Sequence, residues 1–342
     1  MINVKSEVVE ECIEASPKIF IVGMARSGTV WTSQTLSTSS VVGVVGESLY
    51  WGRNYIDPDF GNGYSKEVAI SAMQDLLRNG AVVPMKNIHG DADRNDFLQS
   101  VKNVVESSFF PENGRYTPKD VFDIGMGAFG RVMGKSVIVE KTPHHLMWLE
   151  RINANYPESK FIITIRDPYE CMLSYKHQSD RKTGVEKKKL KSIYHPVLYP
   201  IIWKASMNKA KKYSCMYDGR VLLIRNEDIK KDQLCVLKKI EKFLNLKEGD
   251  LKPREQLNSS FTEAVKPDLS SADIFWMNIM AGRLVKEYRG SLRLVGKDYS
   301  SIFFSTFTLF PSIFSALRVR AKDSNMNVLK YAASWIFNSI SK

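Results

Sequence analysis

The stretch that decides the fold is IFIVGMARSGTVW, residues 19–31. It opens with four consecutive apolar residues, Ile19–Val22, which predict a buried strand. Gly23–Gly28 predict a tight turn, and a helix is expected to start near Thr29. A strand that enters a helix through a glycine-bounded loop leaves several backbone N–H groups pointing one way, and such a concavity binds phosphate-like anions. The alternative is a strand–turn–helix junction whose glycines serve only the geometry of the turn.

The composition is that of an ordinary globular protein with a strong positive charge. The chain has 342 residues, of which 44% are hydrophobic and 25% charged, so one large α/β domain or two smaller ones can form. The formal net charge of +12 predicts an anionic partner. Composition alone leaves that partner open as a nucleotide, a nucleic acid, an acidic glycan or a membrane surface.

Cysteine spacing and the N-terminal sequence favour a cytoplasmic protein. The four cysteines have neither metal-ligand nor redox spacing, which is typical of reduced thiols. Glutamates crowd the N-terminus, so no signal peptide is predicted there. No apolar run reaches the length of about 18 residues that predicts a membrane-spanning helix.

Further apolar runs predict more strands of the same sheet. They are Val41–Val45, Ser136–Val139, Phe161–Ile165 and Val221–Ile224, and each is followed by polar or charged residues. Helical patterns separate them: Trp31–Ser37, His145–Asn155, Pro168–His177 and Gln233–Leu244. This alternation predicts an α/β protein with a mainly parallel, doubly wound sheet. Its ligand site is expected at the carboxyl edge of the strands.

Two long insertions interrupt this pattern, at residues 54–135 and 176–220. The second contains twelve lysines and arginines but only three acidic residues, so it supplies much of the positive charge. Such a segment is either a solvated helix face and lid or a surface for an acidic ligand.

The C-terminal tail, residues 301–342, changes character. It is rich in phenylalanine up to Phe314, then basic, and it ends in apolar residues at helical spacing from Val328 to Ile340. An amphipathic basic helix of this kind can lie in a membrane interface. The alternatives are a helix packed on the domain and a contact between two copies in a homodimer.

A second motif begins with Arg166-Asp-Pro and includes Ser174. Asp167 can cap a helix whose first residue is Pro168, because the fixed φ of proline suits that position. The arginine fork and the serine hydroxyl are donors suited to phosphate oxygens. A structural alternative pairs Arg166 with a carboxylate of the sheet.

Together, the first loop and the Arg166–Ser174 motif resemble the sulfotransferase family that uses 3′-phosphoadenosine 5′-phosphosulfate (PAPS). Three further segments resemble weaker family motifs: Glu140–Pro143, Leu223–Asp228 and Trp276–Val295. The likeness spans residues 18–300, between an N-terminal extension (1–17) and the tail (301–342). It implies a three-layer, P-loop-type sulfotransferase domain of the carbohydrate or tyrosylprotein branch.

The resemblance assigns residues to the two ends of the donor. It implies that Arg26, Ser27, Gly28, Thr29, Val30 and Trp31 bind the 5′-phosphosulfate, and that Arg166 and Ser174 bind the 3′-phosphate. Many members carry a second threonine where Val30 stands. The change removes a hydroxyl but keeps the backbone N–H, so donor binding is expected to weaken by about 1 kcal/mol rather than to vanish.

Sulfuryl transfer resembles phosphoryl transfer in needing positioned positive charge, which side chains can supply in place of a metal. Arg26 and Lys141 are expected to supply that charge, and no metal site is expected. The transfer also needs a base to deprotonate a hydroxyl acceptor.

We favour Glu47 as the base, because it follows a strand at the ligand edge and resembles the glutamate base of the tyrosylprotein branch. Its structural alternative is a salt bridge to Arg53. His144 and His145 are the competing bases, unless they cap or pack the helix that starts there.

Two other functions remain open from the sequence. The first loop also resembles the G-x-x-x-x-G-K-[ST] loop of kinases and NTPases, but Thr29 stands where their lysine should be. A non-enzymatic basic module for membranes or nucleic acid is the alternative from another class. We expect a cytoplasmic sulfotransferase, peripheral on a membrane at most, with a glycan, glycolipid or small-molecule hydroxyl as acceptor and no nucleic acid partner.

Overall fold

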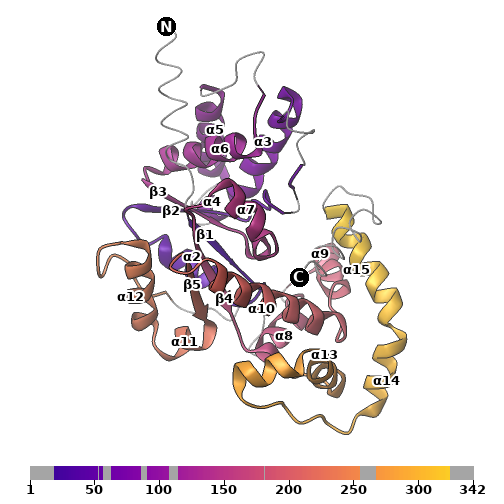
Figure 1. The fold of residues 1–342 in the computed structure, drawn as a ribbon. Coiled ribbons are helices and arrows are strands. Elements are labelled where there is room, and N and C mark those ends of the chain that lie inside the picture. Colours follow the sequence, from indigo (N-terminus) through magenta and orange to yellow (C-terminus); the bar gives the residue numbers. More distant parts are fainter. Residues whose placement is uncertain are drawn as a thin grey trace.

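The computed structural model describes residues 19–52, 54–56, 63–85, 91–107, 115–180, 182–254 and 267–323. At its centre, five parallel strands form a sheet in the order β2-β3-β1-β4-β5 (Figure 1). The strands are β1 (Ile19–Gly23), β2 (Val42–Gly46), β3 (Val137–Lys141), β4 (Lys160–Ile165) and β5 (Val221–Arg225). The predicted α/β fold with a mainly parallel sheet is confirmed.

Helices connect the strands and cover the sheet. In chain order they are α2 (Thr29–Leu36), α3 (Lys66–Gly80), α4 (Val82–Met85), α5 (Asp91–Ser107), α6 (Pro118–Met133), the 3-10 helix η1 (Pro143–Trp148), α7 (Leu149–Asn155), α8 (Pro168–Lys176), α9 (Gly184–Ser192), α10 (Leu198–Met216), α11 (Asn226–Lys231), α12 (Gln233–Leu244), α13 (Ser271–Arg289), α14 (Tyr299–Phe307) and α15 (Leu309–Asp323).

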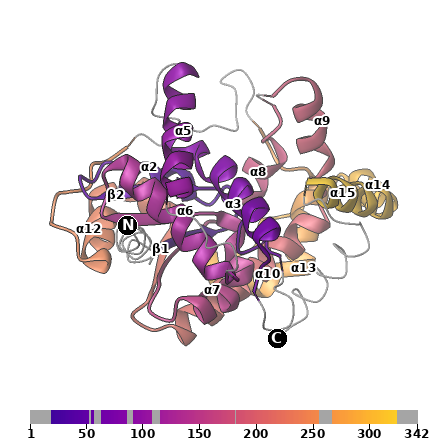
Figure 2. The same cartoon turned by 90° about the horizontal axis from the view of Figure 1, so that it is seen from above.

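The sheet separates two hydrophobic cores, because side chains of a strand alternate between its faces. In β1, Phe20 and Val22 belong to the larger core, and Ile19 and Ile21 to the smaller. The larger core is packed by α3, α5, α6, α7, α8, α10 and α13, and the smaller by α2, α11 and α12 (Figures 1 and 2). The result is a three-layer arrangement in which one helical layer is much thicker.

The predicted insertion at 54–135 ends in a helix that belongs to this thick layer. α6 starts with a capping box between Thr117 and Asp120, has Pro118 in its first turn, and ends at Gly134 in the left-handed conformation. It packs on β2 and β3, and Phe122 and Phe129 are fully buried. This part of the insertion is therefore integral to the fold.

The prediction of one continuous helix over His145–Asn155 is wrong in its first half. Residues up to Trp148 form the 3-10 helix η1, and α7 starts only at Leu149. The His145 N–H donates to the Thr142 carbonyl at 3.0 Å, and its buried ring lies 3.0 Å from Glu140 at the end of β3. The tighter 3-10 winding holds the ring against the sheet.

The two ends of the chain are described only in part. The N-terminal extension, residues 1–17, lies outside the described residues, and so does the apolar pattern from Val328 to Ile340. The described part of the tail forms α14 and α15, which run along the outside of the molecule beyond α13 (Figure 1). Among the described helices, none has the length and apolar character needed to cross a membrane.

Candidate active site

The residues singled out by the sequence gather at the carboxyl edge of the sheet. Because all five strands are parallel, their carboxyl ends meet at the same edge. In spatial order, the residues that end or follow the strands are Glu47 after β2, Lys141 in β3, Arg26 after β1, Arg166 after β4 and Arg225 in β5. One acidic and four basic side chains therefore come from five separate segments.

The loop after β1 needs its two glycines for close approach as well as for backbone conformation. Gly23 has φ 149°, and a Cβ there would lie 2.4 Å from the Thr164 carbonyl oxygen. Gly28 has φ 113°, and a Cβ there would lie 2.8 Å from Nδ2 of Asn226. Arg26 also adopts a positive φ, of 73°. The loop is thus pressed between β4 and α11.

Several side chains of this loop point inward rather than toward a ligand. Ser27 is fully buried, and its hydroxyl contacts Thr164 Oγ1 at 2.7 Å and donates to the Met24 carbonyl at 2.6 Å. Thr29 is buried as well. The Trp31 indole donates to the Arg254 carbonyl at 3.1 Å, within the smaller core. Ser27 and Trp31 therefore shape the loop through their side chains and offer only their backbone groups to an anion.

The start of α2 supplies such backbone groups. Its N-cap is Gly28, and no described side chain caps the helix. The first N–H groups of a helix lack partners within the helix, and they carry its positive dipole end. Val30 is 45% exposed beside them. An added hydroxyl at this position would face solvent or a ligand.

The two sequence motifs meet through side-chain contacts. Arg26 Nε donates to Ser174 Oγ at 3.1 Å, and Arg166 Nη1 donates to the Arg26 carbonyl at 3.0 Å. The thiol of Cys171 donates to the Ala25 carbonyl at 3.4 Å. α8 and the end of β4 therefore hold residues 25–26 of the loop in place.

Burial and charge are strong at this junction. Burial lowers the pKa of the Arg26 guanidinium, and nearby Arg166 lowers it further. Burial also raises the pKa of the Cys171 thiol to about 11, so this cysteine is an uncharged structural contact. Nε of Arg166 is buried and has no hydrogen-bond partner among the described residues, although Nη2 lies 3.1 Å from Glu170. The alternative pairing of Arg166 with a sheet carboxylate is not observed, since Glu170 belongs to α8.

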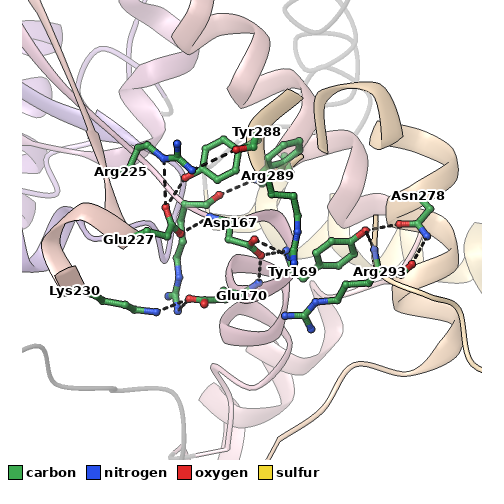
Figure 3. A network of polar contacts seen from close by, with 12 residues as sticks. Asp167, Tyr169, Glu170, Arg225, Glu227, Lys230, Asn278, Tyr288, Arg289 and Arg293 are labelled. Atoms are coloured by element: carbon green, nitrogen blue, oxygen red, sulfur yellow. Dashed lines mark hydrogen bonds and ion pairs between the residues drawn. The ribbon is translucent and has the colours of Figure 1, made fainter. Parts of the chain in front are cut away.

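A polar network next to Arg166 ties α8 to α11 and α13 (Figure 3). Asp167 caps α8 by accepting from the N–H groups of Tyr169 and Glu170, as predicted, and its other oxygen lies 2.8 Å from Arg289. Glu227 accepts from the Asp167 N–H at 2.7 Å and from the Tyr288 hydroxyl at 2.6 Å. This network fixes the turn that carries Arg166.

Arg289 and Arg293 were not among the residues predicted for the site. Arg289 ends α13, directly before Gly290 in the left-handed conformation. The Arg293 guanidinium lies over the Tyr169 ring, 4.9 Å from its centroid. The sequence signal that could have found them is Arg-Gly-x-x-Arg at the end of a long helix, because such a glycine ends a helix and leaves the cations beyond its C-terminus.

On the other side of β1, Lys141 pairs with Glu47. Lys141 ends β3 and is 2% exposed, and its ammonium group donates to Glu47 Oε1. Glu47 directly follows β2 and is 53% exposed. Register explains the contact, because Gly46 and Lys141 are partners across the β2–β3 pair. The alternative partner of Glu47, Arg53, lies outside the described residues.

A buried cluster below this pair holds the loop that carries Glu47. Glu140 Oε1 accepts from the Ser48 hydroxyl at 2.7 Å and from the Ser48 N–H at 3.3 Å. The Leu49 N–H donates to Thr142 Oγ1 at 3.4 Å. Burial by itself raises the pKa of Glu140, but His145, Thr142 and Ser48 outweigh it, so the pKa is lowered. Sequence analysis missed this role for Glu140 and Ser48, because the contact joins residues far apart in the chain.

The two histidines considered as bases differ in their surroundings. His145 is fully buried and bonded to Glu140, so it packs the start of its helix and does not reach a ligand. His144 is exposed in η1, close to Gly52. Among the described residues, no group of three or more His, Cys, Asp or Glu side chains lies together as a metal site would require.

The fold and this edge of the sheet define a class of protein. It is a three-layer α/β protein with positive potential at one place, which comes from the glycine-bounded loop, the helix N-terminus and the adjacent arginines. A family model described as the sulfotransferase family matches residues 17–250. The chain therefore belongs to the sulfotransferase family, as the resemblance of its motifs implied. No curated protein sequence matches the chain.

Solved structures to which the chain is similar include three from bacteria. A sulfotransferase from Alicyclobacillus acidocaldarius has 17% identity and a TM-score of 0.44, over 81% of this chain and 97% of the other. Sulfotransferase STF9 from Mycobacterium avium has 11% identity and a TM-score of 0.44, over 83% and 79%. The sulfotransferase domain of the Synechococcus PCC 7002 olefin synthase has 15% identity and a TM-score of 0.38, over 86% and 94%.

Proposed function

We propose that this protein transfers a sulfuryl group from PAPS to a hydroxyl acceptor. The observation that carries the proposal is the hydrogen bond of 3.1 Å between Arg26 Nε and Ser174 Oγ. It joins the loop after β1 to the helix after β4, so the two anion sites that the sequence motifs define lie side by side. A donor with a phosphosulfate at one end and a 3′-phosphate at the other needs such an arrangement.

In this proposal the N–H groups at the start of α2 bind the 5′-phosphosulfate. The guanidinium of Arg166 and the hydroxyl of Ser174 bind the 3′-phosphate, where an anion satisfies the unpartnered Nε of Arg166. Arg26 lies between the two sites, because its backbone is part of the loop after β1 and its side chain reaches Ser174 on α8. Ser27 and Trp31 contribute through the backbone, because their side chains form hydrogen bonds inside the protein, and Thr29 lies between them at the start of α2.

Glu47 and Lys141 perform the transfer in this proposal. As the acceptor oxygen attacks sulfur, its proton passes to Glu47 and the sulfur–oxygen bond to the phosphate breaks. The phosphate then leaves with the electrons of that bond, and the charge on its oxygen is stabilised by Lys141 and Arg26. Burial makes Lys141 effective here, because solvent screens its charge little.

The contact between Glu47 and Lys141 favours Glu47 as the base over His144. Glu47 reaches solvent and forms an ion pair with the buried ammonium group of Lys141, so a carboxylate and a cation lie next to each other at the site. His144 follows in η1, three residues beyond Lys141 in the chain. We assign the chain to the carbohydrate or tyrosylprotein branch, with a glycan, glycolipid or small-molecule hydroxyl as acceptor, and with the cytoplasm as its compartment.

Titration calorimetry with adenosine 3′,5′-bisphosphate, the desulfated product, tests the donor assignment. We expect binding by the wild type and at least about tenfold weaker binding by Arg166→Ala, because hydrogen bonds to charged groups contribute about 1.5–3 kcal/mol each. Arg78→Ala is the matched control, since Arg78 is exposed on α3 and pairs with Asp75. Binding of ATP with Mg²⁺ but not of the bisphosphate would instead indicate a kinase or NTPase.

An acceptor screen with labelled PAPS tests the reaction itself. Candidate glycans, glycolipids and small hydroxyl compounds are incubated with the wild type, Glu47→Gln and His144→Ala. We expect label transfer to an acceptor by the wild type and His144→Ala, and loss of transfer in Glu47→Gln. Transfer that survives Glu47→Gln and disappears in His144→Ala would move the base to His144.

A further inference from the structure

α14 contacts the protein through two polar residues at its C-terminal end, whereas its aromatic residues face solvent. Ser305 is buried and accepts a hydrogen bond of 2.8 Å from the Trp276 indole of α13, and Thr308 Oγ1 lies 3.2 Å from His195 Nε2. Phe303, Phe304 and Phe307, in contrast, are each about two-thirds exposed. A helix on a globular protein ordinarily has the opposite arrangement, with its apolar side against the core.

The exposed aromatic side chains continue into α15 and form one ridge. Phe310 and Phe314 are 79% and 61% exposed, and Tyr299 at the start of α14 is exposed as well. The Phe303 and Phe307 rings contact each other, with 4.7 Å between centroids. We call Tyr299, Phe303, Phe304, Phe307, Phe310 and Phe314 the aromatic ridge. An exposed apolar surface of this extent marks an interaction site, because exposure of so many large apolar groups to water is unfavourable.

A cluster of cations lies beside the ridge. α9 contacts α15, and Figures 1 and 2 both show the two helices side by side. No residue of α9 is buried, and it carries Lys187, Lys188, Lys189 and Lys191. Exposed Arg318 on α15 adds a further positive charge. We call these five cations the basic cluster.

The basic cluster is where the excess charge of the 176–220 segment reaches the surface. Several other cations of that segment form ion pairs within the fold: Lys176 with Asp273, Lys209 and Lys212 with Glu150, and Lys211 with Glu287. Within α9, Glu186 is the acidic residue, and it pairs with Lys182. Lys187, Lys188 and Lys191 therefore face solvent, with Glu186 as the acidic residue of their own helix.

We propose that the aromatic ridge and the basic cluster together bind the surface of an anionic membrane. Aromatic side chains enter the interface between headgroups and acyl chains, while neighbouring lysines contact anionic headgroups. The cations beside the ridge favour an anionic membrane over a second copy of this basic chain, because anionic headgroups complement their charge. Duplex nucleic acid does not match a ridge of phenylalanines, because its bases are stacked inside the helix and its phosphates contact cations rather than apolar rings.

Co-sedimentation of the full-length protein with vesicles tests the proposal. One set of vesicles is pure phosphatidylcholine, and the other contains phosphatidylglycerol in addition. We expect at least about tenfold tighter partition to the anionic vesicles, because several lysines beside an anionic surface are attracted to it together. Added salt should weaken this partition.

Two variants separate the contributions of the ridge and the cluster. Phe304→Ser/Phe307→Ser/Phe310→Ser and a replacement of the four α9 lysines by alanine should each lower partition by about tenfold or more. The matched controls change exposed residues elsewhere: Leu234→Ser/Met216→Ser for the aromatic variant, and alanine at Lys231, Lys239, Lys242 and Lys247 for the lysine variant. Both controls should bind as the wild type does.

Three results would overturn the proposal. The first is a wild type that stays in the supernatant with both kinds of vesicle. The second is a lysine variant that binds no more weakly than its matched control. The third is a wild-type dimer, detected by analytical ultracentrifugation, that the phenylalanine variant dissociates. Thermal melting and bisphosphate binding show whether each variant is folded, since every substituted side chain is exposed.

Discussion

The two halves of the candidate site differ in how firmly the fold holds them. On the β4 side of β1, Arg26, Arg166 and Ser174 are linked by hydrogen bonds to each other, and the network around Asp167 supports them. On the β3 side, the backbone of the loop is held by Glu140, but the half-exposed Glu47 side chain has one polar contact among the described residues, with buried Lys141. We call these the arginine half and the Glu47–Lys141 half.

This difference matches the separate tasks proposed for the two halves. A site for the donor gains affinity from groups that are already in position, because ordering them on binding costs free energy. A base must reach an acceptor that arrives from solvent, which the exposure of Glu47 allows. The comparison predicts that changes in the arginine half act on donor affinity, and that changes in the Glu47–Lys141 half act on the rate of transfer.

The largest effect is expected for Glu47→Gln. Loss of the base should lower kcat by about 100-fold or more, because general base catalysis contributes about 10²–10⁴. The affinity for adenosine 3′,5′-bisphosphate should change little. Steady-state kinetics together with calorimetry check this, and an equal loss of donor-product affinity would erase the distinction between the two halves.

A smaller effect, of the opposite kind, is expected for Ser174→Ala in the arginine half. Removal of the hydroxyl takes a partner from Arg26 Nε and a donor from the 3′-phosphate site. KM for PAPS should rise by about tenfold with little change in kcat, since one hydrogen bond to a charged group contributes about 1.5–3 kcal/mol. A fall in kcat at unchanged KM would contradict the proposed division of roles.

Glu140→Gln tests whether the cluster below Glu47 supports the second half. The substitution weakens buried contacts to Ser48, Thr142 and His145, so we expect a loss of about 1–3 kcal/mol in the free energy of unfolding. Urea denaturation followed by tryptophan fluorescence measures this loss. Glu140→Asp is the matched comparison, because it keeps the charge and shortens the side chain.

The pH dependence of that stability has a definite sign. The pKa of Glu140 is lowered in the folded protein from its ordinary value of 4.5, so the folded state binds this proton less readily than the unfolded state. The stabilisation by Glu140 is therefore complete above pH 4.5 and is lost as the pH falls below it. Below pH 4.5 the wild type should lose stability more steeply than Glu140→Gln. Parallel curves would show that the carboxylate charge does not contribute.

The smallest effect is expected for Val30→Thr. Val30 is exposed at the start of α2, so a threonine there fits without repacking and adds one hydroxyl next to the anion site. Affinity for adenosine 3′,5′-bisphosphate should rise by about fivefold, the equivalent of one hydrogen bond of about 1 kcal/mol. Val185→Thr on α9 is the control at a distant exposed valine.

Local sequence signals predicted the framework of this fold well. The helix Gln233–Leu244 has the bounds that were predicted, because an acidic N-cap at Asp232 and a left-handed residue at Asn245 mark its ends. The cap at Asp167 is confirmed for the same reason, since capping depends on neighbours in the chain. The helix over His145–Asn155 was wrong at its start because a contact from β3 governs the winding there.

The direction of side chains was much less predictable. The sequence pattern makes Ser27 and Trp31 look like ligand-facing residues, yet their polar groups bond to Thr164 and Arg254. The same holds for the tail, where the pattern predicts an amphipathic helix but not which side faces the protein. The exposure of the phenylalanines, together with the hydrogen bond between Ser305 and Trp276, shows that the phenylalanines point outward.

The sequence by itself determined the strands, the glycine loop, the caps and the family, because each depends on residues that are close together in the chain. The tertiary structure alone decided that Arg26 reaches Ser174, that Lys141 pairs with Glu47, and that Glu140 holds Ser48. These contacts join residues that lie 148, 94 and 92 positions apart. They form because parallel strands bring the ends of distant segments to one edge, and no local pattern encodes which ends become neighbours.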